Sequence, residues 1–79
     1  MSQKRSITRF GEKLRVLRIR HGLTLLELAH ALGYVTHTYI SEIETGKKMP
    51  TAEFVLGVAR LFNVTTDQLL KDELNLEEK

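Results

Sequence analysis

Two short segments between Thr24 and Gly46 are bounded in the same way, and this punctuation constrains the fold more than any other feature of the chain. Each segment opens with a threonine, Thr24 or Thr36, and each is closed by a glycine, Gly33 or Gly46. A threonine hydroxyl accepts a hydrogen bond from an unpaired amide at the start of a helix, and glycine readily adopts the left-handed conformation that ends one. The pattern predicts two short helices joined by a turn, which is the arrangement of a helix-turn-helix.

Apolar residues within both segments recur at helical spacing, which supports the same prediction. Glu27 stands three residues after Thr24, as in a reciprocal capping box. The residues expected to face the core are Leu25, Leu28, Ala29 and Leu32 in the first segment, and Val35, Ile40 and Ile43 in and before the second. Thr36 is expected to cap the second helix.

The outer face of the second segment consists of small and medium hydrogen-bonding side chains: His37, Thr38, Ser41, Glu42 and Thr45. Such side chains suit the edges of base pairs in a major groove, which differ in their donor and acceptor patterns. Polar outer faces are also the default for surface helices, so spacing alone leaves an ordinary helical hairpin open.

Length and composition exclude several classes of protein. A chain of 79 residues supports one small core without a deep catalytic cleft, and the absence of cysteine excludes disulfides, thiolate chemistry and cysteine-based zinc sites. His21, His30 and His37 are too widely spaced for a metal site. No apolar run approaches the roughly 18 residues that span a bilayer. We expect a soluble, cytoplasmic protein without enzymatic activity, metal or cofactor.

Charge is distributed unevenly along a chain whose net charge is only +2. Residues 1–20 contain seven lysines and arginines and one glutamate, whereas residues 51–79 contain three basic and six acidic residues. This asymmetry is expected when one pole of a molecule meets phosphate and the other does not. A solvated basic helix is the alternative interpretation.

The remainder of the sequence predicts three more helices. The first runs from a Thr8 cap to about His21, with Phe10, Leu14, Val16 and Leu17 inward and Gly22 ending it. After a loop closed by Pro50, a helix capped by Thr51 buries Phe54, Val55, Val58, Leu61 and Phe62 and ends at Asn63, and a capping box of Thr65 and Gln68 opens the last. The prediction is an all-α, compact five-helix domain over residues 8–72, between a basic arm (1–7) and an acidic tail (73–79).

At this level of detail the sequence resembles the Cro/C1-type, lambda-repressor-like (XRE) helix-turn-helix regulators. The resemblance covers about residues 10–71 and rests on FGEKLRVLRIRHGLT, LLELAHALG, YISEIETGKKMP and FNVTTDQLL, in that order. It implies a lambda-repressor-like domain that binds operator DNA, usually as a symmetric dimer, with the second helix crossing the backbone and the third in the major groove. We expect a repressor that occludes polymerase, and an activator stays open as the alternative.

The resemblance assigns roles to individual residues. By position, Thr36, His37, Thr38, Ser41 and Glu42 fall where family members read bases, and Lys47 and Lys48 fall in the loop that contacts phosphate. Of the first group we expect His37, Thr38, Ser41 and Glu42 to read bases, with Thr36 chiefly a cap that touches the DNA backbone. From the sequence itself we also expect backbone contacts from Thr24, Thr45 and Tyr39, whose ring packs partly against the core. Arg18 and Glu44 fall on a pair that forms an internal salt bridge in such proteins, so Glu44 is interpreted as structural.

The sequence departs from the family pattern in three places. Leu25 stands where a DNA-binding glutamine is frequent, Tyr34 is an extra residue in the turn, and Glu42 and Thr45 occupy positions where arginine is common. The third helix is therefore poor in positive charge. A carboxylate at position 42 is accounted for if it accepts from a cytosine amino group.

The C-terminal leucines predict self-association. Leu69, Leu70, Leu74 and Leu76 provide more apolar surface than a terminal helix needs for its own packing, and an exposed apolar patch usually marks an interface. The expected partners are double-stranded DNA and a second copy of the chain, without a membrane or a small-molecule effector. The alternatives are an antitoxin-type interaction module and a restriction-modification controller.

Overall fold

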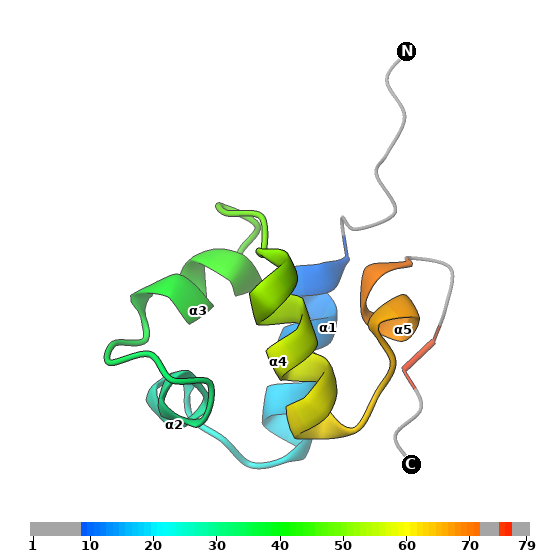
Figure 1. Ribbon diagram of the computed structural model, residues 1–79. Coiled ribbons are helices and arrows are strands. Elements are labelled where there is room, and N and C mark those ends of the chain that lie inside the picture. The colour runs from blue at the N-terminus through cyan, green and yellow to red at the C-terminus, as the bar shows by residue number, and fades with distance from the viewer. Residues whose placement is uncertain (1–8, 72–74, 77–79) are drawn as a thin grey trace.

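The computed structural model describes residues 9–71 and 75–76 and contains five helices: α1 (Phe10–Arg20), α2 (Leu25–Ala31), α3 (Thr38–Glu44), α4 (Ala52–Phe62) and α5 (Thr66–Leu70). No strand occurs in this part of the chain. In Figure 1 α4 crosses the middle of the molecule with α1 behind it, while α2 and α3 lie on one side and α5 on the other. The predicted all-α, five-helix fold is confirmed.

Side-chain caps fix where three of these helices begin. The hydroxyl oxygens of Thr24, Thr51 and Thr65 accept from amides three residues on, at 3.0, 3.1 and 2.9 Å. Glu27 and Gln68 reach back to the amides of Thr24 and Thr65, which completes both predicted capping boxes. The predicted Thr8 cap lies outside the described residues.

The turn between α2 and α3 differs from the sequence prediction. Gly33 ends α2 with a φ of 91°, as expected, but α3 begins only at Thr38, with His37 in the N-cap position and no side-chain cap bond. Thr36 therefore does not cap α3. Val35 was expected in the core but is 85% exposed, because the longer turn directs Tyr34 towards the core in its place.

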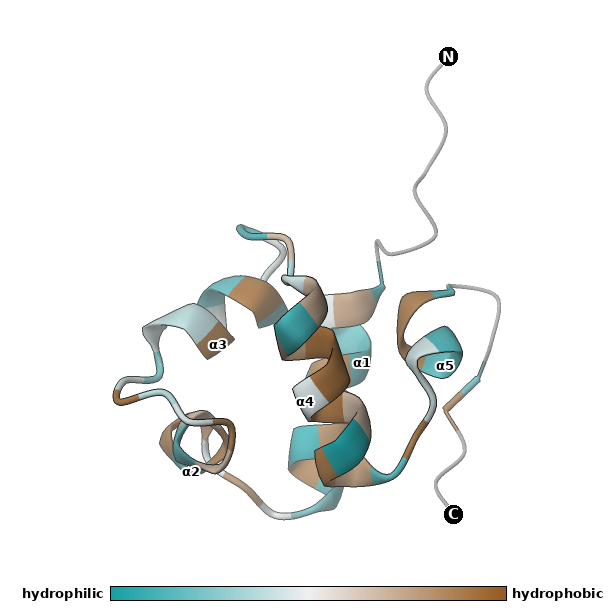
Figure 2. Cartoon of the chain, in the orientation of Figure 1, coloured by the Kyte–Doolittle hydropathy of each residue, from teal (hydrophilic) through white to brown (hydrophobic). Residues whose placement is uncertain are grey.

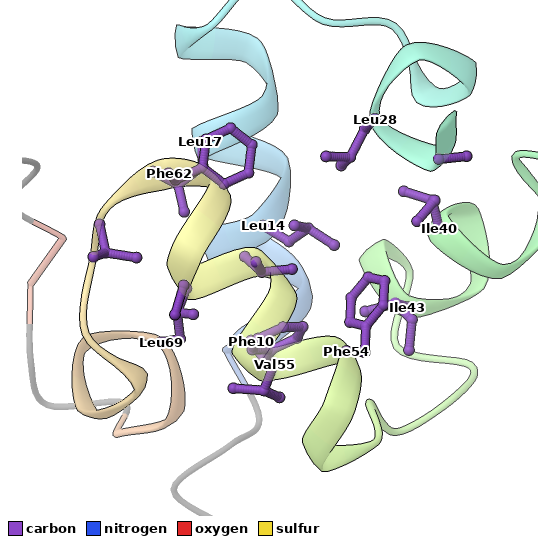
Figure 3. Packing of buried hydrophobic residues seen from close by; sticks show 14 residues of the cluster. Phe10, Leu14, Leu17, Leu28, Ile40, Ile43, Phe54, Val55, Phe62 and Leu69 are labelled. Atoms are coloured by element: carbon purple, nitrogen blue, oxygen red, sulfur yellow. The ribbon is translucent and has the colours of Figure 1, made fainter. Parts of the chain in front are cut away.

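All five helices contribute to one hydrophobic core, whose side chains converge in Figure 3. Its buried members are Phe10, Leu14, Leu17, Leu28, Ala29, Ile40, Ile43, Phe54, Val55, Val58, Ala59, Phe62, Val64 and Leu69. Val16 and Leu61, both predicted to face inward, are exposed. Each lies beyond the edge of the apolar stripe of its helix, where no neighbouring helix covers it. Figure 2 shows the corresponding pattern, with brown predominating on α4 and much of α3 white or teal.

A buried lysine joins α1 to α5. Among the described residues Lys13 is the one charged side chain in the core, and its ammonium donates to the carbonyl oxygens of Gln68 and Lys71, the latter at 2.7 Å. These carbonyls lie at the end of α5, where a cation satisfies otherwise unpaired acceptors. Lys13 lies three residues after Phe10 and four before Leu17. The helical spacing that predicted the apolar stripe of Phe10, Leu14 and Leu17 therefore also places Lys13 on that face.

A glycine allows α1 to approach α3 more closely than any other residue would. A Cβ atom at Gly11 would lie well inside contact distance of the Ile43 carbonyl oxygen and 2.9 Å from that of Glu44. Both obstacles are backbone atoms, which cannot move aside without displacing the end of α3. Gly11 is thus required by the packing of these two helices.

We expect Gly11→Ala to lower the free energy of unfolding by about 1–3 kcal/mol, the usual cost of forcing extra volume into a packed contact. Gly57→Ala is the matched control, because a Cβ there meets only the end of the Leu32 side chain at 3.4 Å. It should be neutral or stabilising, since alanine favours a helix interior over glycine. Thermal or urea melts compare the two variants. Equal stabilities of the two would contradict the close approach of α1 to α3.

Candidate nucleic-acid interface

The helix α3 presents one face to the core and the opposite face to solvent. Ile40 and Ile43 are fully buried. Of the residues predicted to read or contact DNA on this helix, His37, Thr38 and Thr45 are exposed and Ser41 and Glu42 are half-buried. The predicted base-reading residues therefore share one accessible surface, which begins at the N-terminal tip of α3.

An ion pair holds the other end of α3 against α1. Arg18 Nε donates to Glu44 Oε2 at 2.7 Å and Arg18 Nη2 to Glu44 Oε1 at 3.2 Å, while Nη1 donates to the Leu23 carbonyl oxygen at 2.9 Å. The two side chains are 14% and 6% exposed. This is the contact that the family resemblance implied, and it leaves the Glu44 carboxylate turned away from any ligand of α3.

Aromatic rings pack against one another where α3 meets α4. The Tyr39 ring lies 5.2 Å from the rings of both Tyr34 and Phe54, and its hydroxyl is buried without a hydrogen-bond partner among the described residues. Tyr39 was expected to pack partly against the core, as it does, but in this structure its hydroxyl is not accessible to a phosphate. Burial raises the pKa of Tyr34, with smaller contributions from Tyr39 and Glu53, so its hydroxyl stays neutral at physiological pH.

The loop after α3 contains two lysines in different surroundings. Gly46, with a φ of 83°, turns the chain back so that the amides of Lys47 and Lys48 donate to the Glu42 carbonyl oxygen at 2.8 and 3.2 Å. The Lys48 ammonium pairs with Glu42 Oε1 at 3.2 Å. The exposed Lys47 forms no ion pair within the described part of the chain. Lys47 is thus the more available of the two for a phosphate.

The three threonines predicted to contact the DNA backbone are all exposed. The Thr24 oxygen accepts from Glu27 and keeps its own proton for donation. The Thr45 hydroxyl donates to the Ser41 carbonyl oxygen at 2.9 Å. Thr36, which has no capping role, lies in the turn that precedes α3.

Three of the basic side chains that the structure describes in residues 9–20 are already bound within the protein. Arg9 pairs with Glu12 at 2.9 Å, Lys13 is buried against α5 and Arg18 is bound to Glu44. These three cations are engaged within the protein, whereas Arg15 is exposed. Positive charge available to a phosphate is therefore less than the sequence count predicted.

The C-terminal leucines occupy different places. Leu69 is fully buried in the core of its own chain and offers no exposed surface to a second copy. Leu76 packs partly against the same core. Leu70 lines an apolar groove of about 420 Å³ with Pro50, Ala52, Val55, Leu56 and Thr66. Leu74 lies outside the described residues.

The part of the chain that the structure describes contains no group of three or more histidine, aspartate or glutamate side chains arranged to hold a metal ion. None of its helices has the length and apolarity needed to cross a membrane.

Comparison with known proteins adds independent findings. A family model described as helix-turn-helix matches residues 14–69. The HTH-type transcriptional activator BcrR of Enterococcus faecalis is 44% identical over 64 residues, which cover 81% of this chain but only 31% of that protein. The uncharacterized HTH-type transcriptional regulator YazB of Bacillus subtilis (strain 168) is 31% identical over 64 residues, covering 81% of this chain and 91% of YazB.

A solved structure with a similar fold is that of the P22 c2 repressor protein in complex with a synthetic operator. Its TM-score is 0.73 at 25% sequence identity, with 81% of this chain and 96% of that chain covered. The similarity thus extends over nearly the whole of that chain.

We expect the Arg18–Glu44 pair to be necessary for stability, because each residue alone would leave a largely desolvated charge. Arg18→Met and Glu44→Leu should each cost about 3 kcal/mol. The double variant should cost clearly less than the sum of the two, since it leaves no unpaired charge. Chemical unfolding of the four proteins measures this, and additive losses would show that the two residues do not interact.

Proposed function

The chain belongs to the Cro/C1-type (XRE) helix-turn-helix family of DNA-binding transcriptional regulators, and from this membership we propose that it binds a specific duplex sequence through α3. The observation that carries the proposal is the accessible polar face of α3, supported from behind by Ile40, Ile43 and the Arg18–Glu44 pair. Recognition helices of this class insert their N-terminal residues into the major groove.

Within this proposal the residues of α3 and its flanks have separate roles. His37, Thr38, Ser41 and Glu42 read base edges. Backbone contacts come from Thr24, Thr36, Thr45 and Lys47. Tyr39 is omitted because its hydroxyl is buried, and Lys48 because its ammonium pairs with Glu42. Base contacts confer sequence preference, whereas phosphate contacts add affinity for all sequences alike.

We further propose that the protein acts as a homodimer on a palindromic operator. The apolar groove between α4 and α5 supports this, because Leu56 and Leu70 line it and Leu56 is 44% exposed. A two-fold axis at this groove would present two copies of α3 to successive major grooves, about 34 Å apart.

Repression by occlusion of a promoter is the proposed outcome of binding. Its support is the likeness to the P22 c2 repressor, which extends over 96% of that chain. Activation is the second candidate, because BcrR is named an activator, although the chain spans only 31% of its length. Transcription in vitro from a promoter that contains the selected site, with and without the protein, separates the two.

We expect Thr38→Val and Lys47→Met to weaken DNA binding in different ways. Thr38→Val keeps the side-chain shape but removes a hydrogen bond, so it should cost about 1–3 kcal/mol at the preferred site and relax preference at one base pair. Lys47→Met should weaken all sequences and reduce the slope of log affinity against log salt by about 0.9.

Selection of sites from random duplex DNA, followed by salt titrations on selected and scrambled duplexes, provides both measurements. A wild-type protein whose affinity does not change with salt would contradict binding to duplex DNA. Thr38→Val with wild-type base preference would remove residue 38 from the reading face.

The homodimer is tested by charging the groove. Leu56→Glu should shift the protein towards monomer in sedimentation equilibrium at micromolar concentration, because a carboxylate in an apolar interface is strongly unfavourable. Leu61→Glu is the matched control. Leu61 is on the same helix and is 41% exposed, but it lies roughly 140° around the helix from Leu56. A wild-type protein that stays monomeric with its site bound would exclude the dimer.

A further inference from the structure

Glu42 places a negative charge on the face of α3 that is proposed to enter the major groove. It is half-buried, and its neighbours on this face, Thr38, Ser41 and Thr45, are all uncharged. A carboxylate this close to two lines of phosphates would be repelled unless a cation accompanied it. If α3 enters the groove, a cation close to the Glu42 carboxylate is therefore needed.

Lys48 supplies that cation from the loop that follows α3. Its ammonium lies 3.2 Å from Glu42 Oε1 and 5.9 Å from the centroid of the Tyr39 ring. Tyr39 and Glu42 are one helical turn apart, so their side chains lie on adjacent parts of the helix surface. The ring face attracts a cation, and the carboxylate adds a direct ion pair.

The backbone of the loop keeps Lys48 in this position. Two successive amides, those of Lys47 and Lys48, donate to the carbonyl oxygen of Glu42 itself. The residue that needs a counter-ion therefore also anchors the segment that provides it. Because Lys48 binds Oε1, the second carboxylate oxygen, Oε2, is left to accept from a ligand.

We propose that Lys48 is a positioning residue whose ammonium serves as the intramolecular counter-ion of Glu42, so that Glu42 Oε2 can accept a hydrogen bond from the amino group of a cytosine. Lys48 is then not a phosphate ligand, unlike its neighbour Lys47. This inference rests on the proposed function, since it assumes that α3 enters the major groove.

The test is a double-mutant comparison in DNA binding. The probe is the duplex that the wild-type protein selects from random sequence, alongside a scrambled duplex. In the wild-type background Lys48→Met should reduce affinity for the selected duplex about tenfold, blur one cytosine preference and leave the salt slope nearly unchanged. In the Glu42→Gln background, where no carboxylate needs a counter-ion, Lys48→Met should cost less than about twofold.

Lys47→Met is the matched control, because it removes the adjacent charge without an ion pair to Glu42. It should reduce affinity by the same factor in both backgrounds and lower the salt slope by about 0.9, as the loss of a phosphate contact does. Lys48→Arg should retain wild-type affinity and base preference, since a guanidinium also pairs with a carboxylate. Both lysines are exposed, so thermal melts should show folded proteins throughout.

The inference is overturned if Lys48→Met has the same effect in both backgrounds, or if it lowers the salt slope as Lys47→Met does. Either result would make Lys48 an ordinary phosphate ligand while leaving DNA binding intact. A wild-type protein that selects no duplex would overturn the proposed function together with this inference.

Discussion

The contact between α1 and the C-terminal end of α3 is the interaction on which the candidate interface depends. A helix of seven residues is too short to be stable in water by itself, so the direction of α3 is set by what it packs against. Gly11 lets the backbones of the two helices meet, and seven residues later on the same face of α1 the Arg18 guanidinium binds Glu44. The outward face of α3 therefore has a fixed orientation relative to the core.

Three basic side chains of this molecule bind acceptors within the same chain. Lys13 closes the end of α5, Arg18 anchors α3, and Lys48 neutralises Glu42. Each cation thus satisfies an acceptor within the chain before any ligand binds. A domain of this size has few apolar contacts to hold short helices, and directional ion pairs add the orientation that non-directional burial does not provide. The consequence for binding is that composition overstates the charge available to phosphates.

Local features could be predicted from the sequence because their causes lie within a few residues. The caps at Thr24, Thr51 and Thr65, the terminating Gly33 and Asn63, and the stripe of Phe10, Leu14 and Leu17 all follow from spacing and side-chain chemistry.

Features that depend on neighbouring helices could not be predicted from the sequence. The exposure of Val35, the unpartnered Tyr39 hydroxyl and the burial of Leu69 are decided by how the long turn and α5 pack. Gly11 and Lys13 did leave signals, a glycine inside a helix and a charge within an apolar stripe, but their partners lie 32 or more residues away.

The most direct test of the account is a nuclear magnetic resonance titration of the isotope-labelled protein with its selected duplex, following every backbone amide. The account predicts that the largest chemical-shift changes fall on residues 36–48, which comprise the end of the turn, α3 and the loop that contains Lys47. Amides of α5 and of the C-terminal half of α4 should change little at a constant oligomeric state. Changes concentrated on α4 and α5, with α3 unaffected, would contradict the assignment of α3 as the DNA-reading helix.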